Sequence, residues 1–359
     1  MAAPSPPSPP QTSTHPDSPG LHNRSSYLFS DTIRSTSESN EKYGVKEHAQ
    51  HIEQARQNTP STALDELDHI TEFPNKWARI RAKLREPAAE FLGTMILIIF
   101  GTGVDCQVVL SGSTAVAPGP KGEYLSISFG WAIGTALGVW GGHINPAVTL
   151  AQAIFRGFSW KKVPAYILSQ VLGAMTGAGL VYANYHRAIS LFEGGPEVRT
   201  IKTASLFTTF ALDYLSNIQC FFSEVLATAI LLLVVLAVTD RRNGPPPDGL
   251  VPLVLFITIL GEGACLGMQT AYALNPARDL GPRLMCWMAV WNYRSQYWLY
   301  TPIIGPIVGA IAGTAIYDAF IFTGSESIFN KPDAATRRRH EHAPREAKGK
   351  IIPSGMDAV

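Results

Sequence analysis

The sequence predicts an all-α membrane protein, with six transmembrane helices and two half-spanning re-entrant helices arranged in two inverted repeats. Three observations predict this fold: long apolar stretches in the middle of the chain, two short apolar stretches that each open with Asn-Pro, and a likeness between the two halves of that middle. The chain-wide averages of 46% hydrophobic and 16% charged residues hide the pattern, because polar ends dilute an apolar centre.

A helix that crosses the hydrocarbon core of a bilayer needs about 20 mostly apolar residues. Six stretches qualify, namely 87–110, 124–140, 162–185, 216–239, 249–270 and 298–322. The stretches 145–155 and 275–291 are apolar but shorter, and each opens with Asn-Pro. Proline in the first turn of a helix forfeits no hydrogen bond, so these two stretches predict half-spanning helices.

The two ends of the chain differ in composition from this centre. Residues 1–86 and 323–359 carry most of the proline, serine and charged residues, and the first twenty residues contain seven prolines. Such segments cannot bury enough apolar surface to fold alone, so we expect disordered tails at both ends. The membrane domain is then 87–322.

Lys and Arg near the span ends predict the orientation in the membrane, because they concentrate on the cytosolic side. The flanks rich in them are the N-terminal one, the second and fourth connections and the segment after the sixth span (Lys76, Arg79, Arg81, Lys83, Arg85; Arg156, Lys161, Lys162; Arg241, Arg242; Arg337 to Arg339). The first connection has only Lys121, and the third has Arg187, Arg199 and Lys202. We therefore expect both termini, with their tails, in the cytosol.

The two halves of the membrane domain, about 87–185 and 216–322, repeat two short motifs. Residues 89–94 (AEFLGT) recur as 223–228 (SEVLAT), and Asn145-Pro146-Ala147 recurs as Asn275-Pro276-Ala277. The spacing from glutamate to asparagine is 145 − 90 = 55 in one copy and 275 − 224 = 51 in the other. Each half contributes three spans, an odd number, so the second copy enters the membrane from the opposite side.

These residues resemble the major intrinsic protein family, the aquaporins and aquaglyceroporins, over essentially all of 87–322. Residues 170–174 (QVLGA) and 305–310 (GPIVGA) are similar to the third and sixth spans of that family. Asp279, Gly281-Pro282-Arg283 and Pro302-Ile303 resemble the glycerol-conducting branch. The resemblance implies a passive transmembrane channel for glycerol and similar small neutral solutes, with some water, and not an enzyme. It also implies a homotetramer with one pore in each subunit.

By position, the resemblance places a selectivity filter at Trp131, Gly263, Tyr272 and Arg278. An arginine in an apolar setting is costly, so Arg278 should face a water-filled cavity, where its donors bind solute hydroxyls and its charge excludes cations. Trp131 and Tyr272 can receive the carbon backbone of a polyol on their flat faces, although ordinary packing is an alternative for both. Phe129 is an alternative to Trp131 at its filter position.

The two Asn-Pro-Ala motifs predict a pair of helix starts that meet at mid-membrane. Each start carries roughly half a positive charge, which repels cations. Asn145 and Asn275 would offer NH₂ donors to a water or hydroxyl oxygen and so interrupt a proton-conducting chain, the alternative being simple helix capping.

Four further residues are expected to support the loops around the motifs. Glu90 and Glu224 are either proton-relay groups of a coupled transporter or, as we favour, acceptors for backbone N–H groups in the irregular chain before each half-helix. His143 either fixes its loop or forms part of the pore wall. Asp279 is expected to fix loop geometry near a helix start, where an acid is electrostatically favoured.

One feature departs from the family pattern. Trp131 and Asn145 are 145 − 131 = 14 residues apart, a turn or more shorter than the family usually has, with the gap around Trp140-Gly141-Gly142-His143. We expect a strained or displaced first half-helix and impaired conduction. A closed or non-conducting protein of the same fold is therefore an alternative function, and a proton-coupled solute transporter is a further one.

The expected partners are glycerol, water and other small neutral solutes, the lipid bilayer, and copies of the same chain in a homotetramer. We expect a multi-pass protein of the plasma membrane. No cofactor and no metal are expected, because the four cysteines show no metal-ligand spacing. The net charge of +1 gives no case for nucleic-acid binding.

Overall fold

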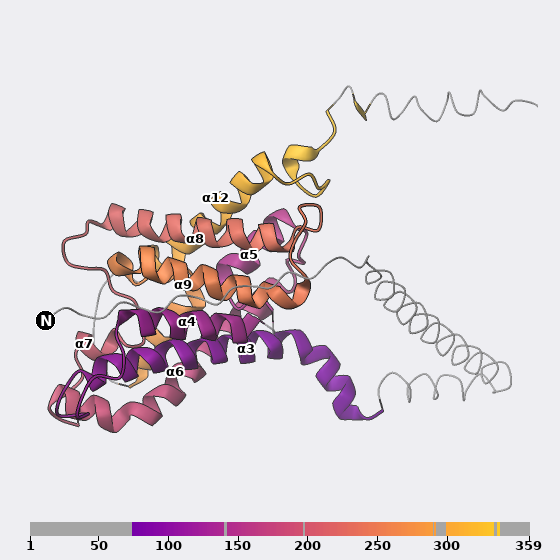
Figure 1. Ribbon diagram of the computed structural model, residues 1–359. Coiled ribbons are helices and arrows are strands. Elements are labelled where there is room, and N and C mark those ends of the chain that lie inside the picture. The colour runs from indigo at the N-terminus through magenta and orange to yellow at the C-terminus, as the bar shows by residue number, and fades with distance from the viewer. Residues whose placement is uncertain are drawn as a thin grey trace, which may run out of the picture. The chain divides into compact units, whose positions relative to one another are not determined.

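The computed structural model describes residues 74–139, 142–196, 198–289, 291, 299–333 and 336–337. The chain divides into two compact units, residues 1–80 and 81–359, and the contacts given below lie within the second. The elements of these described ranges are all helical, as the predicted fold class requires (Figure 1). The longer helices are α3 (Lys76–Ser111), α4 (Tyr124–Gly138), α6 (Val163–Glu193), α8 (Asn217–Thr239), α9 (Val251–Thr270) and α12 (Gly305–Phe320).

Shorter helices fill the connections. The predicted half-spanning helices are α5 (Pro146–Phe155) and α10 (Pro276–Met288), and both start at the proline of an Asn-Pro-Ala motif. The remaining turns are α7 (Ile201–Ala204), η2 (Asp248–Leu250), η3 (Tyr300–Ile304) and η4 (Ile328–Asn330). The single π-turn η3 leads directly into α12.

Among the described residues, five helices are long and apolar enough to cross a membrane: α3, α6, α8, α9 together with η2, and α12 together with η3. The helix α4 has 15 residues, which gives a length of about 22 Å, less than the hydrocarbon core of about 30 Å. The second predicted span is therefore shorter than expected, and its last predicted residue, Trp140, lies outside the described residues together with Gly141.

The two repeats share one packing device, in which glycines let two helices touch. A Cβ atom added to Gly173 of α6 would collide with the backbone oxygen of Phe91 in α3. In the second repeat, a Cβ atom added to Gly309 of α12 would collide with the backbone oxygen of Val225 in α8. Small residues at contacts are typical of membrane helices, where close backbone approach replaces a hydrophobic driving force.

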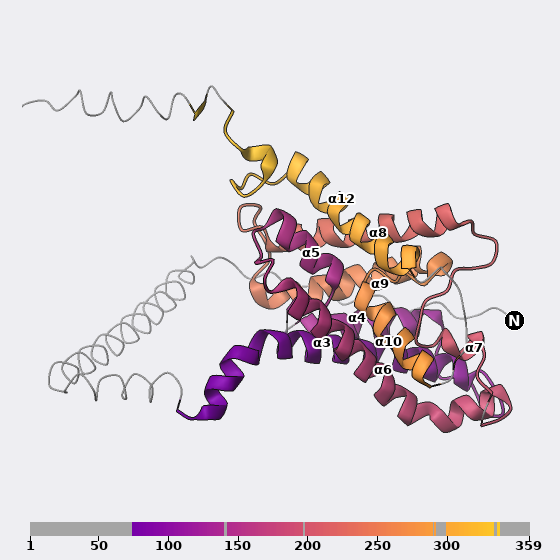
Figure 2. The ribbon, with the colours of Figure 1, turned by 180° about the vertical axis from the view of Figure 1, so that it is seen from behind.

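The repeats are joined to each other through α4 and α9, which lie side by side (Figure 1). Each half-spanning helix packs against a helix of the other repeat: α5 against α12, and α10 against α6 (Figure 2). Because each half-helix contacts the other repeat, its position does not depend on its own repeat alone. The two motifs are thereby held at the contact between the repeats.

Candidate pore and selectivity filter

The two Asn-Pro-Ala motifs face each other and are joined by reciprocal hydrogen bonds. The side-chain amide of Asn145 donates to the carbonyl of Leu274 at 2.9 Å, and that of Asn275 donates to the carbonyl of Ile144 at 2.7 Å. Each side-chain oxygen caps its own half-helix by accepting from the backbone N–H of Ala147 or Ala277. An amide nitrogen carries two hydrogens, so each asparagine has a second donor to offer a passing oxygen atom.

This geometry corrects the expected displacement of the first half-helix. Each asparagine donates a hydrogen bond to the residue that precedes the other asparagine, so the two motifs are aligned. The residues that precede the motifs, Ile144 and Leu274, both have positive φ angles, of 48° and 55°. A bulky residue in this region is strained, and such strain persists only where the surrounding structure holds it. The surroundings that do so are the two glutamates.

Glu90 and Glu224 hold the two loops in equivalent ways. Glu90 accepts the backbone N–H groups of His143 at 2.7 Å and Ile144 at 2.8 Å, while Glu224 accepts those of Ala273 at 2.9 Å and Leu274 at 3.0 Å. Both carboxylates are fully buried. A loop at mid-membrane depth has no water to satisfy its backbone, so these carboxylates supply the acceptors it needs.

His143 and Asp279 also sit in the loops. His143 is among the residues that line the cavity, its ring packs against Phe158 and Tyr166, and its Nδ1 lies 3.1 Å from the hydroxyl of Thr149. Asp279 accepts hydrogen bonds from the backbone N–H and the hydroxyl of Thr209, both at 2.7 Å, and from Arg283. Asp279 therefore ties the start of α10 to the loop before α8 and is itself fully buried.

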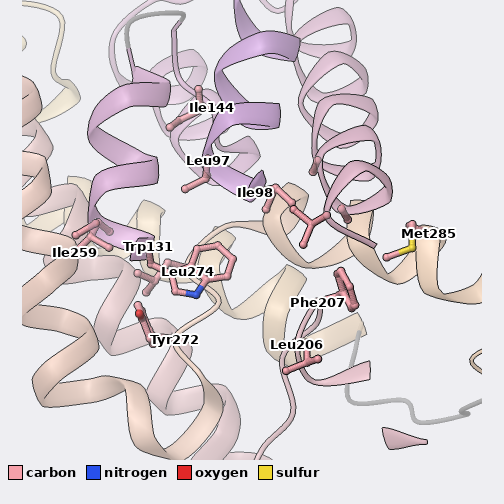
Figure 3. Close-up of a cluster of buried hydrophobic side chains, with 14 of the residues drawn as sticks. Leu97, Ile98, Trp131, Ile144, Leu206, Phe207, Ile259, Tyr272, Leu274 and Met285 are labelled. Atoms are coloured by element: carbon pink, nitrogen blue, oxygen red, sulfur yellow. The ribbon is translucent and has the colours of Figure 1, made fainter. Parts of the chain in front are cut away.

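Trp131, Tyr272 and Arg278, which the sequence predicts as filter residues, line the same cavity, and all three are buried. The guanidinium carbon of Arg278 is 3.9 Å from the centre of the Trp131 ring, and its Nη1 donates to the carbonyl of Phe207 at 3.2 Å. Figure 3 shows Trp131 and Tyr272 close together among apolar side chains that include Leu97.

Phe129, the alternative to Trp131, does not line this cavity. Its side chain is 42% exposed and packs against the ring of Phe256, with 5.7 Å between ring centres. The two residues are only two apart on α4 and so point in very different directions around the helix. Of the two, Trp131 is thus the aromatic residue that α4 presents to this cavity.

Gly263 sits behind Tyr272 instead of opposite to it. A Cβ atom placed on Gly263 would lie 2.9 Å from the Tyr272 hydroxyl, and one placed on Gly267 would lie 2.6 Å from its ring. The two glycines are one turn apart on α9 and form a flat surface for the tyrosine. The hydroxyl of Tyr124 donates to the carbonyl of Gly263 at 2.9 Å and closes the back of this surface.

The cavity next to the filter has a volume of about 210 Å³. Its apolar lining residues include Leu97, Leu231, Leu255 and Ile259. Its polar lining residues are Thr135, His143, Asn145, Gln152, Thr239, Asn275 and Arg278. The wall therefore offers apolar contact and hydrogen-bonding groups along one path.

The sequence analysis did not single out two buried acids as candidate functional residues. Asp105 in α3 accepts a hydrogen bond from the indole N–H of Trp131, and Glu262 in α9 is buried beside the filter residue Gly263. Either could have been found, because an ionisable residue inside an apolar span is by default a candidate for function. What the sequence does not show is the direction in which each side chain points.

The fold and this site define a membrane channel, in which two half-helices of an inverted repeat meet beside one cavity. Residues 76–317 match the model of the family described as Major intrinsic protein. An aquaporin of Laccaria bicolor is 56% identical over 75% of this chain and 89% of its own length, and Aquaporin-6 of Laccaria bicolor is 55% identical over 76% and 93%.

Two further relatives carry more specific names. Aquaglycerol porin AQY3 of Saccharomyces cerevisiae is 44% identical over 77% of this chain and 44% of its own length. The X-ray structure of the aquaglyceroporin from Plasmodium falciparum matches with a TM-score of 0.58 and 30% identity, over 66% of this chain and 96% of that one.

The chain belongs to the major intrinsic protein family. It is an integral, multi-pass membrane protein and a passive channel for water and small solutes, and not an enzyme.

Proposed function

We propose that this channel conducts glycerol and similar small neutral solutes, with some water. The observation that carries the proposal is one cavity lined by both apolar and polar residues, among them Trp131, Tyr272 and Arg278. A polyol has a face of C–H groups and a face of hydroxyl groups, and a path lined by both apolar and polar residues accommodates both at once.

The chemistry of the filter supports the same substrate class. Arg278 offers several N–H donors to hydroxyl oxygens, while its permanent charge opposes the passage of cations. Trp131 and Tyr272 offer flat apolar faces beside it. The names of two relatives, Aquaglycerol porin and aquaglyceroporin, point in the same direction, whereas the Laccaria bicolor relatives carry the general name aquaporin.

The remaining assignments are part of the proposal. We assign the channel to residues 87–322 and cytosolic tails to 1–86 and 323–359, with both termini in the cytosol. Large apolar side chains such as Leu92, Phe100 and Phe222 are exposed on the helices and suit contact with lipid or with further subunits. We place the protein in the plasma membrane as a homotetramer with one pore in each subunit.

The test is solute flux into proteoliposomes, followed by stopped-flow light scattering under separate glycerol and water gradients. We expect glycerol flux well above that of empty vesicles, rising linearly with the gradient and unaffected by a proton ionophore. Water flux without glycerol flux contradicts the assignment of glycerol. Flux that stops when the proton gradient is collapsed indicates the coupled transporter.

A closed filter is the second candidate, and one contact favours it. A guanidinium 3.9 Å from the centre of an indole ring is in stacking contact, so no solute fits between Arg278 and Trp131 as they stand. A solute must pass beside the pair, along Tyr272, or the ring must turn. In the same assay, a closed filter gives neither water flux nor glycerol flux, and Trp131→Ala restores both.

A further inference from the structure

Behind the filter, the acid Asp105 in α3 contacts Trp131. Asp105 is 8% exposed, and the indole Nε1 of Trp131 donates to its two carboxylate oxygens at 3.3 and 3.2 Å. A buried acid inside a membrane span is energetically costly unless hydrogen-bond donors or positive charges stabilise it. The indole N–H and the positive charge of Arg278, which lies within electrostatic reach, offset part of this cost.

A second residue of α3 contacts the same ring. Gly101 precedes Asp105 by one helical turn, so both lie on one face of α3. A Cβ atom added to Gly101 would collide with the six-membered part of the Trp131 indole. The ring therefore lies flat on the helix at Gly101 and is tied at its nitrogen to Asp105, which fixes both its position and its rotation.

The other face of the Trp131 ring is turned toward the Arg278 guanidinium. With α3 behind it and the Arg278 guanidinium 3.9 Å from its centre, the indole is a plate between a helix and a cation. We propose that Asp105 is a positioning residue of the filter, which sets the width of the pore, and so the size limit for solutes, by holding Trp131 against α3. This rests on the proposed function, because it makes Trp131 a wall of the conducting path.

The test compares three variants in proteoliposomes with glycerol and with the four-carbon polyol erythritol. Asp105→Leu removes the acceptor, and the freed indole is expected to raise the erythritol-to-glycerol permeability ratio by about fivefold or more. Asp105→Asn keeps an acceptor oxygen and should stay within about twofold of the wild type. The control is Thr102→Val in the same turn, because the buried hydroxyl of Thr102 donates to the Ile98 carbonyl of its own helix and makes no hydrogen bond to Trp131 among the described residues.

A double-mutant cycle separates positioning from a general loss of stability. In the Trp131→Phe background there is no indole N–H to hold, so adding Asp105→Leu should leave the permeability ratio unchanged within about twofold. A ratio that stays at the wild-type value in Asp105→Leu overturns the proposal. So does an Asp105→Leu effect of equal size in both backgrounds, because it cannot act through the indole.

Failure of the glycerol assignment remains distinguishable from failure of this inference. Wild-type glycerol flux, measured against empty vesicles, decides the assignment on its own. If the wild type carries only water, the same comparison is made with glycerol as the larger solute and water as the smaller one. Asp105→Leu is then expected to admit glycerol while Thr102→Val does not, and continued exclusion of glycerol by Asp105→Leu overturns the role of Asp105.

Discussion

Substitution should destabilise the protein at one of two buried glutamates on neighbouring helices and not at the other. Glu224 in α8 accepts the backbone N–H groups of Ala273 and Leu274, and it also accepts the hydroxyl of Thr270. Glu262 in α9 is 4% exposed, and neither of its carboxylate oxygens has a hydrogen-bond partner among the described residues. We therefore compare Glu224→Ala with Glu262→Met.

The expected size follows from the number of hydrogen bonds. Without Glu224, two backbone N–H groups in a loop at mid-membrane lose their acceptor at a cost of about 1–3 kcal/mol each, or about 2–6 kcal/mol together. Glu262→Met removes a buried carboxyl that no donor compensates and that lies within electrostatic reach of Glu224. Its effect should be neutral or stabilising by about 1 kcal/mol or more.

The assay is thermal unfolding of the purified protein in detergent. Because unfolding of such proteins is commonly irreversible, the apparent unfolding temperature is compared at a single scan rate. We expect a fall of several degrees for Glu224→Ala and no fall for Glu262→Met. If both variants fall by the same amount, burial alone and not hydrogen bonding determines the effect, and the reasoning is wrong.

Three further predictions concern the pore and the packing. Tyr272→Ala should raise the permeability to polyols larger than glycerol, because it removes a wall beside Arg278, and an unchanged size limit in the liposome assay would exclude Tyr272 from the filter. Gly309→Ala should lower the apparent unfolding temperature by forcing α12 away from α8, at a cost of about 1–3 kcal/mol. Its control, Gly179→Ala, adds a Cβ atom that meets nothing within 4 Å beyond its own helix backbone and chain neighbours among the described residues, and should not lower that temperature. Net glycerol uptake should stop at equal concentrations on both sides, and accumulation beyond that point refutes passive flow.

The fold class was predictable because a membrane imposes simple constraints. Its thickness sets the length of a spanning helix, and an Asn-Pro start marks a helix too short to span. The helix ends were less predictable: α3 begins at Lys76, before its apolar stretch, and α6 continues to Glu193. Charged residues are good helix formers, so apolar composition marks the membrane and not the end of a helix.

Within the site, sequence spacing brought out the residues that occur in both repeats. Glu90 and Glu224 could be assigned to the loops because they recur at similar distances from Asn145 and Asn275. Asp105 has no such counterpart, and its importance depends on the rotation of α3 and α4 about their axes. One sequence gives no measure of that rotation, so only the structure shows that Asp105 is the acceptor for the Trp131 indole.

The short connection before Asn145 gives the last prediction. Glycine permits the turn at Gly142, which has a φ angle of 154° and where a Cβ atom would collide with Glu90. The helix α4 ends at Gly138, five residues shorter than its counterpart α9 (20 − 15 = 5). The missing residues therefore shorten the helix α4, while the reciprocal hydrogen bonds of Asn145 and Asn275 are still made.

Inserting about six small residues after Trp140, roughly a turn and a half of helix, tests this interpretation. We expect glycerol permeability within about twofold of the unmodified chain and an unchanged unfolding temperature, because the two asparagines are already paired and the added chain has no broken contact to repair. A control insertion of equal length after Gly244, in the connection between α8 and α9, measures the cost of added chain alone. If the insertion after Trp140 raises both permeability and unfolding temperature while the control raises neither, the short connection does strain the first half-helix. In that case, the shortening of α4 would not fully compensate for the missing turn.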